Sequence, residues 1–412
     1  MSDQASWLRL SRRYLQPYQP QRQAPRMKPY ASILSLLCLL ILLPALAQDK
    51  ASITPQAPIP EPPAIAGTAH LLVDHHTGTV IAEQNADERL DPASLTKIMT
   101  AYVVFRELAA GKIALTDEVL ISEKAWRTGG SKTFIELGKR IPLEVLLHGM
   151  IIQSGNDASV ALAEHVAGGE DTFAHLMNTH AQRLGMSNSH FTNATGLPDP
   201  ELYSTARDMS LVTAATIREF PEFYAWYAEK EYVYHGIKQN NRNRLLWQDP
   251  SVDGVKTGHT EAAGYCLVAS AKRDSMRLTS VVMGAKSEKA RAAASLALLN
   301  YGFRFFESPQ LYPGGKPIEN LRVWMGEIKE LPVGPAMDLH ATIPRGHYHQ
   351  LSARIEKSSD LIAPLAKGDR VGEIVVELEA KEIGRVPLIA LQDVPKGGWW
   401  EWLRDTFLRW FQ

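Results

Sequence analysis

The sequence predicts an α/β domain that is followed by a small all-β domain and a short amphipathic helix. Strand-like runs at both ends of residues 67–309 enclose a long stretch of helical patterns, as expected for one sheet covered by helices. Short alternating runs separated by Pro and Gly then fill residues 310–394. The last stretch, residues 395–412, is rich in tryptophan and has helical periodicity.

The composition limits the kind of protein that the chain can be. It has 412 residues, is 45% hydrophobic and 22% charged, and carries a formal net charge of -1. That length is enough for two or three domains with a sizeable core. The near-neutral charge argues against a nucleic-acid partner, because such a partner would require a basic surface.

The N-terminal region predicts export. The segment MKPYASILSLLCLLILLPALAQ, which begins at Met27, has a basic start, a short apolar run and a small-residue exit, and this is typical of a signal peptide cleaved after Ala47. A membrane-spanning anchor is the alternative, but the apolar run is short for a bilayer. Residues 1–26 are polar and basic, so Met27 is an alternative start. We expect an extension with a signal peptide over residues 1–47 and a Pro-rich linker over residues 48–66.

The two cysteines do not predict a disulfide. Cys38 lies in the expected signal peptide, so Cys266 has no partner in the exported chain. Because Cys266 lies in the apolar run GYCLVASA, we interpret it as a packing residue and not as a nucleophile.

Within residues 67–309 the expected elements follow from periodicity. The run AHLLVDHHTGTVIAE is typical of a hairpin whose turn holds His75 and His76, and we interpret both as exposed turn residues instead of metal ligands. Helical patterns extend from Pro92 to about Arg218. Three strands and a closing helix are then predicted, at Gly254–Gly258, Tyr265–Ala271, Leu278–Met283 and roughly Glu288–Phe305.

Two histidines in the region 310–394 raise the question of a metal site. His347 and His349 are two residues apart and can share one strand face. A metal site would need a third ligand, and none is evident in the sequence there. We therefore expect neither a metal site nor a cofactor.

The aromatic and charged residues of the last stretch separate on a helical wheel. The apolar side holds Trp399, Trp400, Trp402, Leu403, Phe407, Trp410 and Phe411, and the polar side holds Glu401, Arg404, Asp405, Arg409 and Gln412. Such a helix is too short to span a bilayer but suits the membrane interface. Docking on its own β domain is the alternative. The Gly397-Gly398 hinge and the four tryptophans favour the membrane.

Three short motifs hold the candidate catalytic residues. In DPASLTKIMTAY, Ser94 and Lys97 are three residues apart at a predicted helix start, a pattern that a cap and a surface lysine would also explain. The other two motifs are Ser154-Gly155-Asn156 and Lys256-Thr257-Gly258. Together and in this order, the three are typical of penicillin-recognising serine enzymes.

Physical chemistry suggests a role for each motif. A serine hydroxyl needs a base within reach, and positions i and i+3 of a helix are neighbours. Lys97 can be that base near neutral pH only if burial and a second cation, such as Lys256, lower its pKa. The positive end of the helix favours an oxyanion near Ser94. We expect Ser154 to relay a proton, Asn156 to hold a substrate amide, and the glycine of the third motif to leave a strand edge open for an extended peptide.

The chain resembles the D-alanyl-D-alanine carboxypeptidases, which are low-molecular-weight penicillin-binding proteins of the bacterial envelope. Besides the three motifs, the resemblance is carried by STARDM, NRNRLLW, DGVKTGHT, AGYCLVASA and YGFRFFE. It implies a penicillin-recognising α/β domain with helices on an antiparallel sheet, a small β domain, and a helix that anchors the protein to the periplasmic face of the inner membrane. It also implies that the enzyme removes the terminal D-alanine from peptidoglycan pentapeptide stems and is a target of β-lactam antibiotics.

The same resemblance implies roles for individual residues. Ser94 would be the acylated nucleophile, Lys97 its base, and Ser154 the serine of the second catalytic element. Substrate-binding roles are implied for Asn156, Lys256, Thr257, Gly258, His259 and Arg291, the last with the terminal carboxylate of the substrate.

Three alternatives share parts of this pattern. A β-lactamase would use the same acylation chemistry, but the chain has no E-x-x-L-N motif between Asn156 and Lys256 to activate a deacylating water. A DD-endopeptidase would use the same residues on a cross-link. A non-catalytic wall-binding protein would keep the fold alone, and the intact motifs argue against it.

Overall fold

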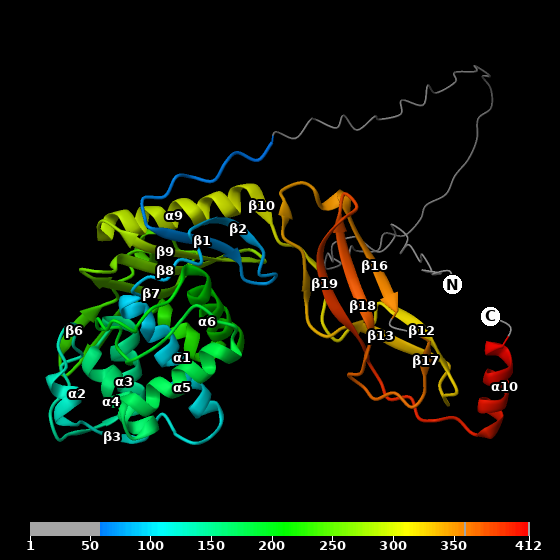
Figure 1. Cartoon of the computed structure of the whole chain (residues 1–412), viewed down its shortest axis with the longest axis horizontal. Helices are drawn as coiled ribbons and strands as arrows, with labels where there is room; N and C mark the ends of the chain where they lie inside the picture. Colours follow the sequence, from blue (N-terminus) through cyan, green and yellow to red (C-terminus); the bar gives the residue numbers. More distant parts are fainter. Residues whose placement is uncertain (1–57, 358–359, 411–412) are drawn as a thin grey trace, which may run out of the picture.

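The protein has two parts of different architecture, an α/β part that ends with helix α9 and a β part that begins with strand β10 (Figure 1). This computed structural model describes residues 58–357 and 360–410, so the expected signal peptide lies outside the described residues. The two parts lie side by side, and the C-terminal helix α10 lies at the end of the β part that is far from the α/β part (Figure 1).

The α/β part is built on one five-stranded sheet in the order β2-β1-β9-β8-β7. All neighbouring strands are antiparallel. The strands are β1 (Ala69–Asp74), β2 (Val80–Gln84), β7 (Val252–Thr260), β8 (Gly264–Arg273) and β9 (Met276–Ala285). The predicted hairpin and the three later strands are thus confirmed. Because β8 and β9 are apolar on both faces, they occupy buried positions inside the sheet, whereas β7 lies at its edge.

Helices cover both faces of this sheet. Figure 1 shows α9 (Glu288–Phe305) on one face and helices α1 to α6 on the opposite face. The second group consists of α1 (Thr96–Ala109), α2 (Glu123–Arg127), α3 (Leu143–His148), α4 (Asn156–Ala167), α5 (Glu170–Arg183), α6 (Ala206–Glu219) and α7 (Pro221–Tyr224). The short helix α8 (Leu245–Gln248) belongs instead with α9, because its Leu245 and Leu246 share one buried cluster with Leu298 of α9. Helix α1 lies at the centre of the second group, and its first ten residues are all buried. A helix that is apolar on every side needs such a central position.

Two small antiparallel strand pairs lie on the outer side of the helical group. Strands β3 (Glu118–Leu120) and β4 (Arg140–Pro142) form one pair, and β5 (Glu231–Tyr234) and β6 (Ile237–Asn240) form the other. Both β6 and α2 lie on the side of the α/β part that faces away from the β part (Figure 1).

The β part contains a six-stranded sheet in the order β16-β18-β19-β13-β12-β17. Its strands are β12 (Glu319–Trp324), β13 (Glu330–Pro335), β16 (Leu351–Lys357), β17 (Leu361–Ile362), β18 (Arg370–Leu378) and β19 (Lys381–Ala390). Two short pairs complete it: β10 (Phe306–Glu307) with β15 (Ile343–Pro344), and β11 (Gln310–Tyr312) with β14 (Leu339–His340). Alternating apolar residues of the long strands form its core, including Leu331, Val333, Ile374, Val376 and Leu388.

The expectation that two histidines of this part share a strand face is wrong. His347 precedes the 3-10 turn η5 (Tyr348–Gln350), and His349 lies within it. The Nδ1 atom of His347 bonds to the side-chain oxygen of Gln350, and that of His349 bonds to the carbonyl of Gly346. The chain turns here before β16 begins, so the two rings serve local hydrogen bonds.

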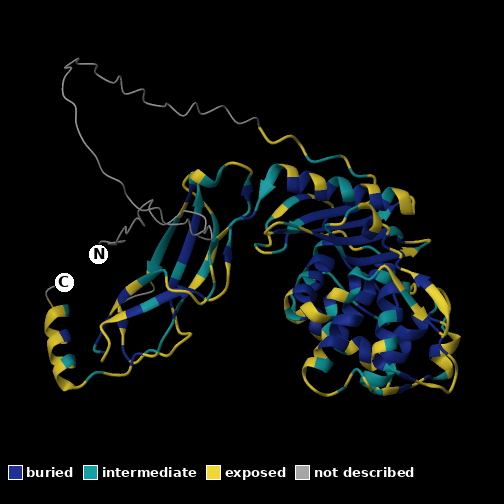
Figure 2. Ribbon diagram, turned by 180° about the vertical axis from the view of Figure 1, so that it is seen from behind, coloured by how far each residue is buried: buried dark blue, intermediate teal, exposed yellow. Residues whose placement is uncertain are grey.

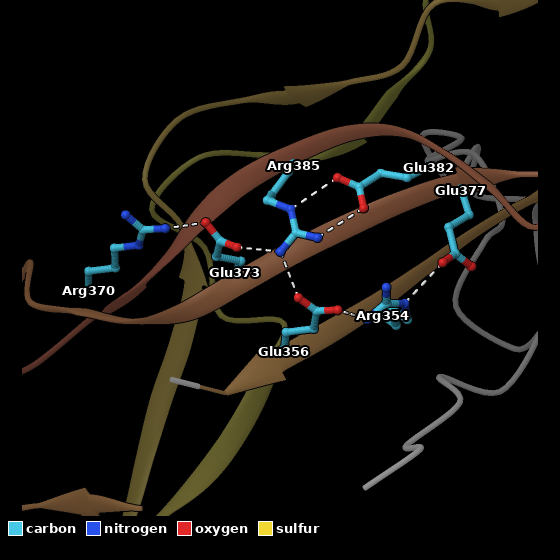
Figure 3. Close-up of polar contacts among 7 residues, drawn as sticks. All are labelled: Arg354, Glu356, Arg370, Glu373, Glu377, Glu382 and Arg385. Carbon is cyan, nitrogen blue, oxygen red and sulfur yellow. Dashed lines mark hydrogen bonds and ion pairs between the residues drawn. The ribbon is translucent and has the colours of Figure 1, made fainter. Parts of the chain in front are cut away.

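A network of ion pairs lies across β16, β18 and β19 (Figure 3). Arg385 is at its centre and contacts three glutamates. The members of the network are Arg354, Glu356, Arg370, Glu373, Glu377, Glu382 and Arg385. Because these side chains are partly exposed, each pair adds little to stability, but the network neutralises most of the charge on this face.

A small polar interface joins the two parts. The ring of His76 stacks on that of His340 at 4.3 Å, and the hydroxyls of Thr77 and Thr342 share a hydrogen bond. Of the two turn histidines expected to be exposed, His76 is exposed but in contact with the β part, whereas His75 is half-buried. Burial is also the main reason why the pKa of His75 falls to about 4.

Helix α10 (Trp399–Arg409) contacts the β part through its polar side. Asp405 is buried, and its carboxylate accepts a hydrogen bond of 2.7 Å from the backbone N–H of Met325. Trp399, Trp400, Trp402 and Trp410 are all more than half exposed. Figure 2 shows exposed residues along most of the helix. Within residues 58–357 and 360–410, no helix combines the length and the apolar character needed to cross a membrane.

Candidate active site

Ser94 lies in a short 3-10 turn, η2 (Ala93–Leu95), directly before α1. The preceding residue, Ala93, has a φ of 45°, a left-handed conformation that is uncommon for a residue with a side chain. The Asp91 carboxylate stabilises this turn, because it accepts the N–H of Ala93 at 2.7 Å and the hydroxyl of Thr260 at 3.1 Å. The turn presents Ser94, which is half-buried, at the start of a helix whose first ten residues are buried.

The amine of Lys97 is within hydrogen-bond distance of the Ser94 hydroxyl. Its Nζ is 3.0 Å from Ser94 Oγ, 2.7 Å from Asn156 Oδ1 and 2.5 Å from the carbonyl oxygen of Thr195. The side chain is buried, and this desolvation, with a smaller repulsion from Arg242, lowers its pKa from 10.5 to about 7. Both protonation states of Lys97 are therefore populated near neutral pH, as a general base requires.

The second motif lies where the π-helical turn η3 (Gly149–Gln153) meets α4. Ser154 ends that turn with a φ of 68° and is buried, and α4 begins at Asn156. The amide nitrogen of Asn156 donates to the carbonyl of Gly129 at 2.7 Å, while its oxygen accepts from Lys97. The side chain of Asn156 thus connects the catalytic helix to the loop that begins at Gly129.

The third motif lies on β7, the edge strand that contacts η2. Lys256 is buried, and its amine donates to the carbonyl of Thr257 at 3.0 Å. Desolvation and the nearby charge of Lys97 lower its pKa well below the ordinary lysine value. A Cβ at Gly258 would lie 3.1 Å from the carbonyl oxygen of Pro92. Glycine therefore allows β7 to pack against the turn that carries Ser94.

The two remaining candidates, His259 and Arg291, lie near the C-terminal end of β7. His259 is exposed, and its ring packs against that of Tyr265 at 4.0 Å. Arg291, on α9, is buried and donates to the carbonyl oxygens of Gly258 at 2.9 Å and Cys266 at 3.4 Å. Its guanidinium thus supports β7 and β8 from within the structure and adds positive charge to that end of the site.

The structure brings the three motifs together, with Lys97 in contact with both Ser94 and Asn156. It also reveals contributors that the sequence analysis did not assign. Arg242 lowers the pKa of both Lys97 and Lys256 through charge repulsion. It lies in the NRNRLLW segment, and that family-like segment was the feature of the sequence that could have pointed to it. Thr195 contacts Lys97 only through its backbone carbonyl, and a pattern of side chains in the sequence does not predict such a contact.

Cys266 is a packing residue, as predicted. Its thiol is free and fully buried in β8. Burial raises its pKa to about 11, so it is not a nucleophile at neutral pH.

Comparisons with known proteins match both parts. A family model described as D-alanyl-D-alanine carboxypeptidase matches residues 56–287, and one described as penicillin-binding protein 5, C-terminal domain, matches residues 306–396. D-alanyl-D-alanine carboxypeptidase DacA of Escherichia coli K12 is 44% identical over 365 residues, which cover 86% of this chain and 91% of DacA. DacC of the same strain is 45% identical over 363 residues, covering 85% and 91%. The crystal structure of penicillin-binding protein 5 from Haemophilus influenzae is similar with a TM-score of 0.76 at 44% identity, covering 82% of this chain and 99% of that one.

Proposed function

The chain belongs to the serine-type D-alanyl-D-alanine carboxypeptidase family, and we propose that it removes the terminal D-alanine of peptidoglycan stem peptides through an ester on Ser94. The observation that carries this proposal is the 3.0 Å contact between Ser94 Oγ and the buried amine of Lys97. An amine with a pKa of about 7 can take the serine proton at neutral pH.

The reaction has two covalent steps. Ser94 Oγ attacks the carbonyl carbon of the penultimate D-alanine while neutral Lys97 takes the hydroxyl proton. The C–N bond then breaks, the leaving amine takes a proton through Ser154, and free D-alanine departs. A water molecule, deprotonated by the same base, attacks the ester and releases the shortened peptide. A β-lactam follows the first step, and ring opening leaves it bound to Ser94.

The substrate would bind along the open edge of β7. An extended peptide can pair with the main chain of this strand between Thr257 and His259, and the amide of Asn156 would contact it from the opposite wall. The buried guanidinium of Arg291 makes this end of the site positive, which suits the terminal carboxylate of the substrate.

Covalent labelling by a fluorescent penicillin tests this function, together with release of D-alanine from a peptide that ends in D-Ala-D-Ala. Ser94→Ala should abolish both signals, while its circular dichroism and unfolding midpoint stay those of the wild type. Labelling of Ser94→Ala at the wild-type rate would disprove the assignment of the nucleophile.

We further propose that the protein is exported, loses residues 1–47, and is held on the periplasmic face of the inner membrane by residues 395–412. In this organisation, residues 67–309 form the peptidase domain and residues 310–394 the β domain. The exposure of four tryptophans on α10, whose polar side contacts the β part, supports this proposal. The charges of that helix balance, so burial of the aromatic face would provide most of the binding energy.

Removal of the helix from the purified full chain tests the anchor. Truncation after Gly397 is preferable to a shorter chain, because Val394 still exchanges backbone hydrogen bonds with Leu365. The truncated protein should remain in solution with anionic vesicles and keep its turnover of soluble peptide, whereas the intact protein should sediment with them even in high salt. Release of the intact protein by salt alone would show that electrostatic attraction holds it.

A further inference from the structure

A surface hollow of about 580 Å³ lies next to the candidate active site and has no role in the mechanism above. It is lined by Trp126, Arg127, Lys132, Phe134, Ile135 and Glu136. These residues come from α2 and the loop that follows it, on the side of the α/β part that faces away from the β part (Figure 1). Aromatic side chains and charges of both signs therefore meet in one open depression.

The backbone of the loop holds one of these aromatic rings out in solvent. Phe134 has a φ of 68° and is 53% exposed, an unusual combination for a bulky side chain. The loop wraps around the buried carboxylate of Asp157, which accepts the N–H groups of Thr133 at 2.8 Å and Phe134 at 2.9 Å. Strained residues held in this way are frequent at sites that bind ligands.

The second aromatic residue of the hollow is Trp126. Trp126 is 42% exposed, and its carbonyl accepts a hydrogen bond of 2.7 Å from the amine of Lys132. Lys132 also lines the hollow, together with the charged residues Arg127 and Glu136. The hollow thus offers two apolar ring surfaces surrounded by donors and one carboxylate.

The same loop contacts the catalytic residues on its inner side. Gly129 accepts a hydrogen bond from the side chain of Asn156, and Ser131 accepts one of 2.8 Å from its backbone N–H. Asn156 in turn contacts Lys97 at 2.7 Å. A ligand in the hollow and a peptide at Ser94 would therefore be separated only by this loop.

We propose that the hollow binds the glycan of the substrate, at an N-acetylated hexosamine. A pyranose ring has apolar C–H faces that suit Phe134 and Trp126, and its hydroxyl and acetamido groups suit the charged residues of the lining. The peptide portion of the same substrate is accounted for by β7 and Asn156, so the sugar is the portion left to bind elsewhere. The inference rests on the proposed function, because it assumes that the enzyme acts on stem peptides attached to glycan.

Two substrates with the same peptide test the proposal: a pentapeptide ending in D-Ala-D-Ala, and the same pentapeptide attached to its disaccharide. For the full-length wild type, we expect a KM about tenfold lower for the disaccharide form, as two weak ring contacts would provide, with kcat unchanged. Phe134→Leu, which keeps an apolar side chain but removes the ring, should abolish this difference. Trp126→Phe keeps a ring and should retain most of it. Leu137→Ala, an exposed apolar residue that does not line the hollow, is the matched control.

The outcomes separate this inference from the proposed function. Equal KM values for both substrates in the wild type would overturn the glycan site while leaving the carboxypeptidase activity intact. An equal rise of KM for both substrates in Phe134→Leu would show that the hollow holds peptide, and this also overturns it. Failure to release D-alanine from either substrate would instead disprove the proposed function.

Discussion

Acylation of Ser94 should depend on pH through the amine of Lys97. With a pKa of about 7, this amine is half neutral at pH 7, whereas at the ordinary value of 10.5 only about 0.03% of it would be neutral. Burial therefore raises the concentration of active base more than about a thousandfold. The base acts in its deprotonated form, so the rate should rise as pH rises through 7 and then level off. At pH 5 it should be about a hundredfold below the plateau.

The assay is the rate of covalent labelling at a saturating concentration of fluorescent penicillin, measured from pH 5 to pH 9. Saturation removes any effect of pH on binding, so the profile reports the chemical step. Arg242→Gln removes a positive charge that lowers the pKa of Lys97, so the midpoint of its profile should move to higher pH. Lys97→Arg, which cannot deprotonate, should lose acylation by about a hundredfold or more.

Two results would refute this reasoning. A labelling rate that is independent of pH between 5 and 8 would show that no group with a pKa near 7 acts in the chemical step. A downward shift of the midpoint in Arg242→Gln would contradict the electrostatic cause assigned to that arginine. Circular dichroism of each variant over the same pH range controls for unfolding.

Three further predictions concern packing and charge. Gly258→Ala should slow acylation about tenfold or more and lower the unfolding free energy by about 1–3 kcal/mol, because its Cβ would lie 3.1 Å from the Pro92 oxygen. Gly384→Ala is the control, since a Cβ at that position would have no atom within 4 Å. Equal effects of the two substitutions would contradict the steric explanation. Cys266 should resist iodoacetamide at pH 8 until urea unfolds the protein, since its pKa is about 11, and labelling of the folded protein would contradict its burial. Arg385→Gln should lower the melting temperature of the β part slightly, because it removes the ion pairs with three glutamates. The decrease should be smaller at high salt, which screens exposed charges. A decrease that is the same at low and high salt would argue against a stabilising role of the ion-pair network.

The long elements of the α/β part could be predicted from periodicity, because they are strongly patterned. The short strands were missed: β3 and β4 lie within the stretch predicted to be helical, and β5 and β6 lie where no strand was predicted. The closing helix, Glu288–Phe305, has the predicted bounds, and the three late strands are confirmed with slightly extended ends. The catalytic helix differs in its start: α1 begins at Thr96, and the residues expected in its first turn form η2 instead. The strained backbone at Ala93 depends on its contacts with other segments, which local propensity does not encode.

The candidate site could be predicted where its chemistry lies in side chains of a recognisable motif. Ser94, Lys97 and Asn156 are of this kind, and they lie in contact. The carbonyl of Thr195 and the charge of Arg242 reach the site from distant segments, so only the folded chain reveals them. The same limit applies to the contact of His76 with His340, which joins residues far apart in the sequence.

The bond between Asp405 and the N–H of Met325 has a mechanical consequence. It fixes α10 against the end of the β part, so the tryptophans of this helix keep one direction relative to the sheet. The contact of His76 with His340 restricts rotation at the other end of the β part. In the membrane-bound form proposed above, the β part would therefore act as a spacer of fixed length, and it would set the height of Ser94 above the lipid. Shortening or lengthening this spacer would change which layer of the wall the enzyme can reach, even if every catalytic distance stayed the same.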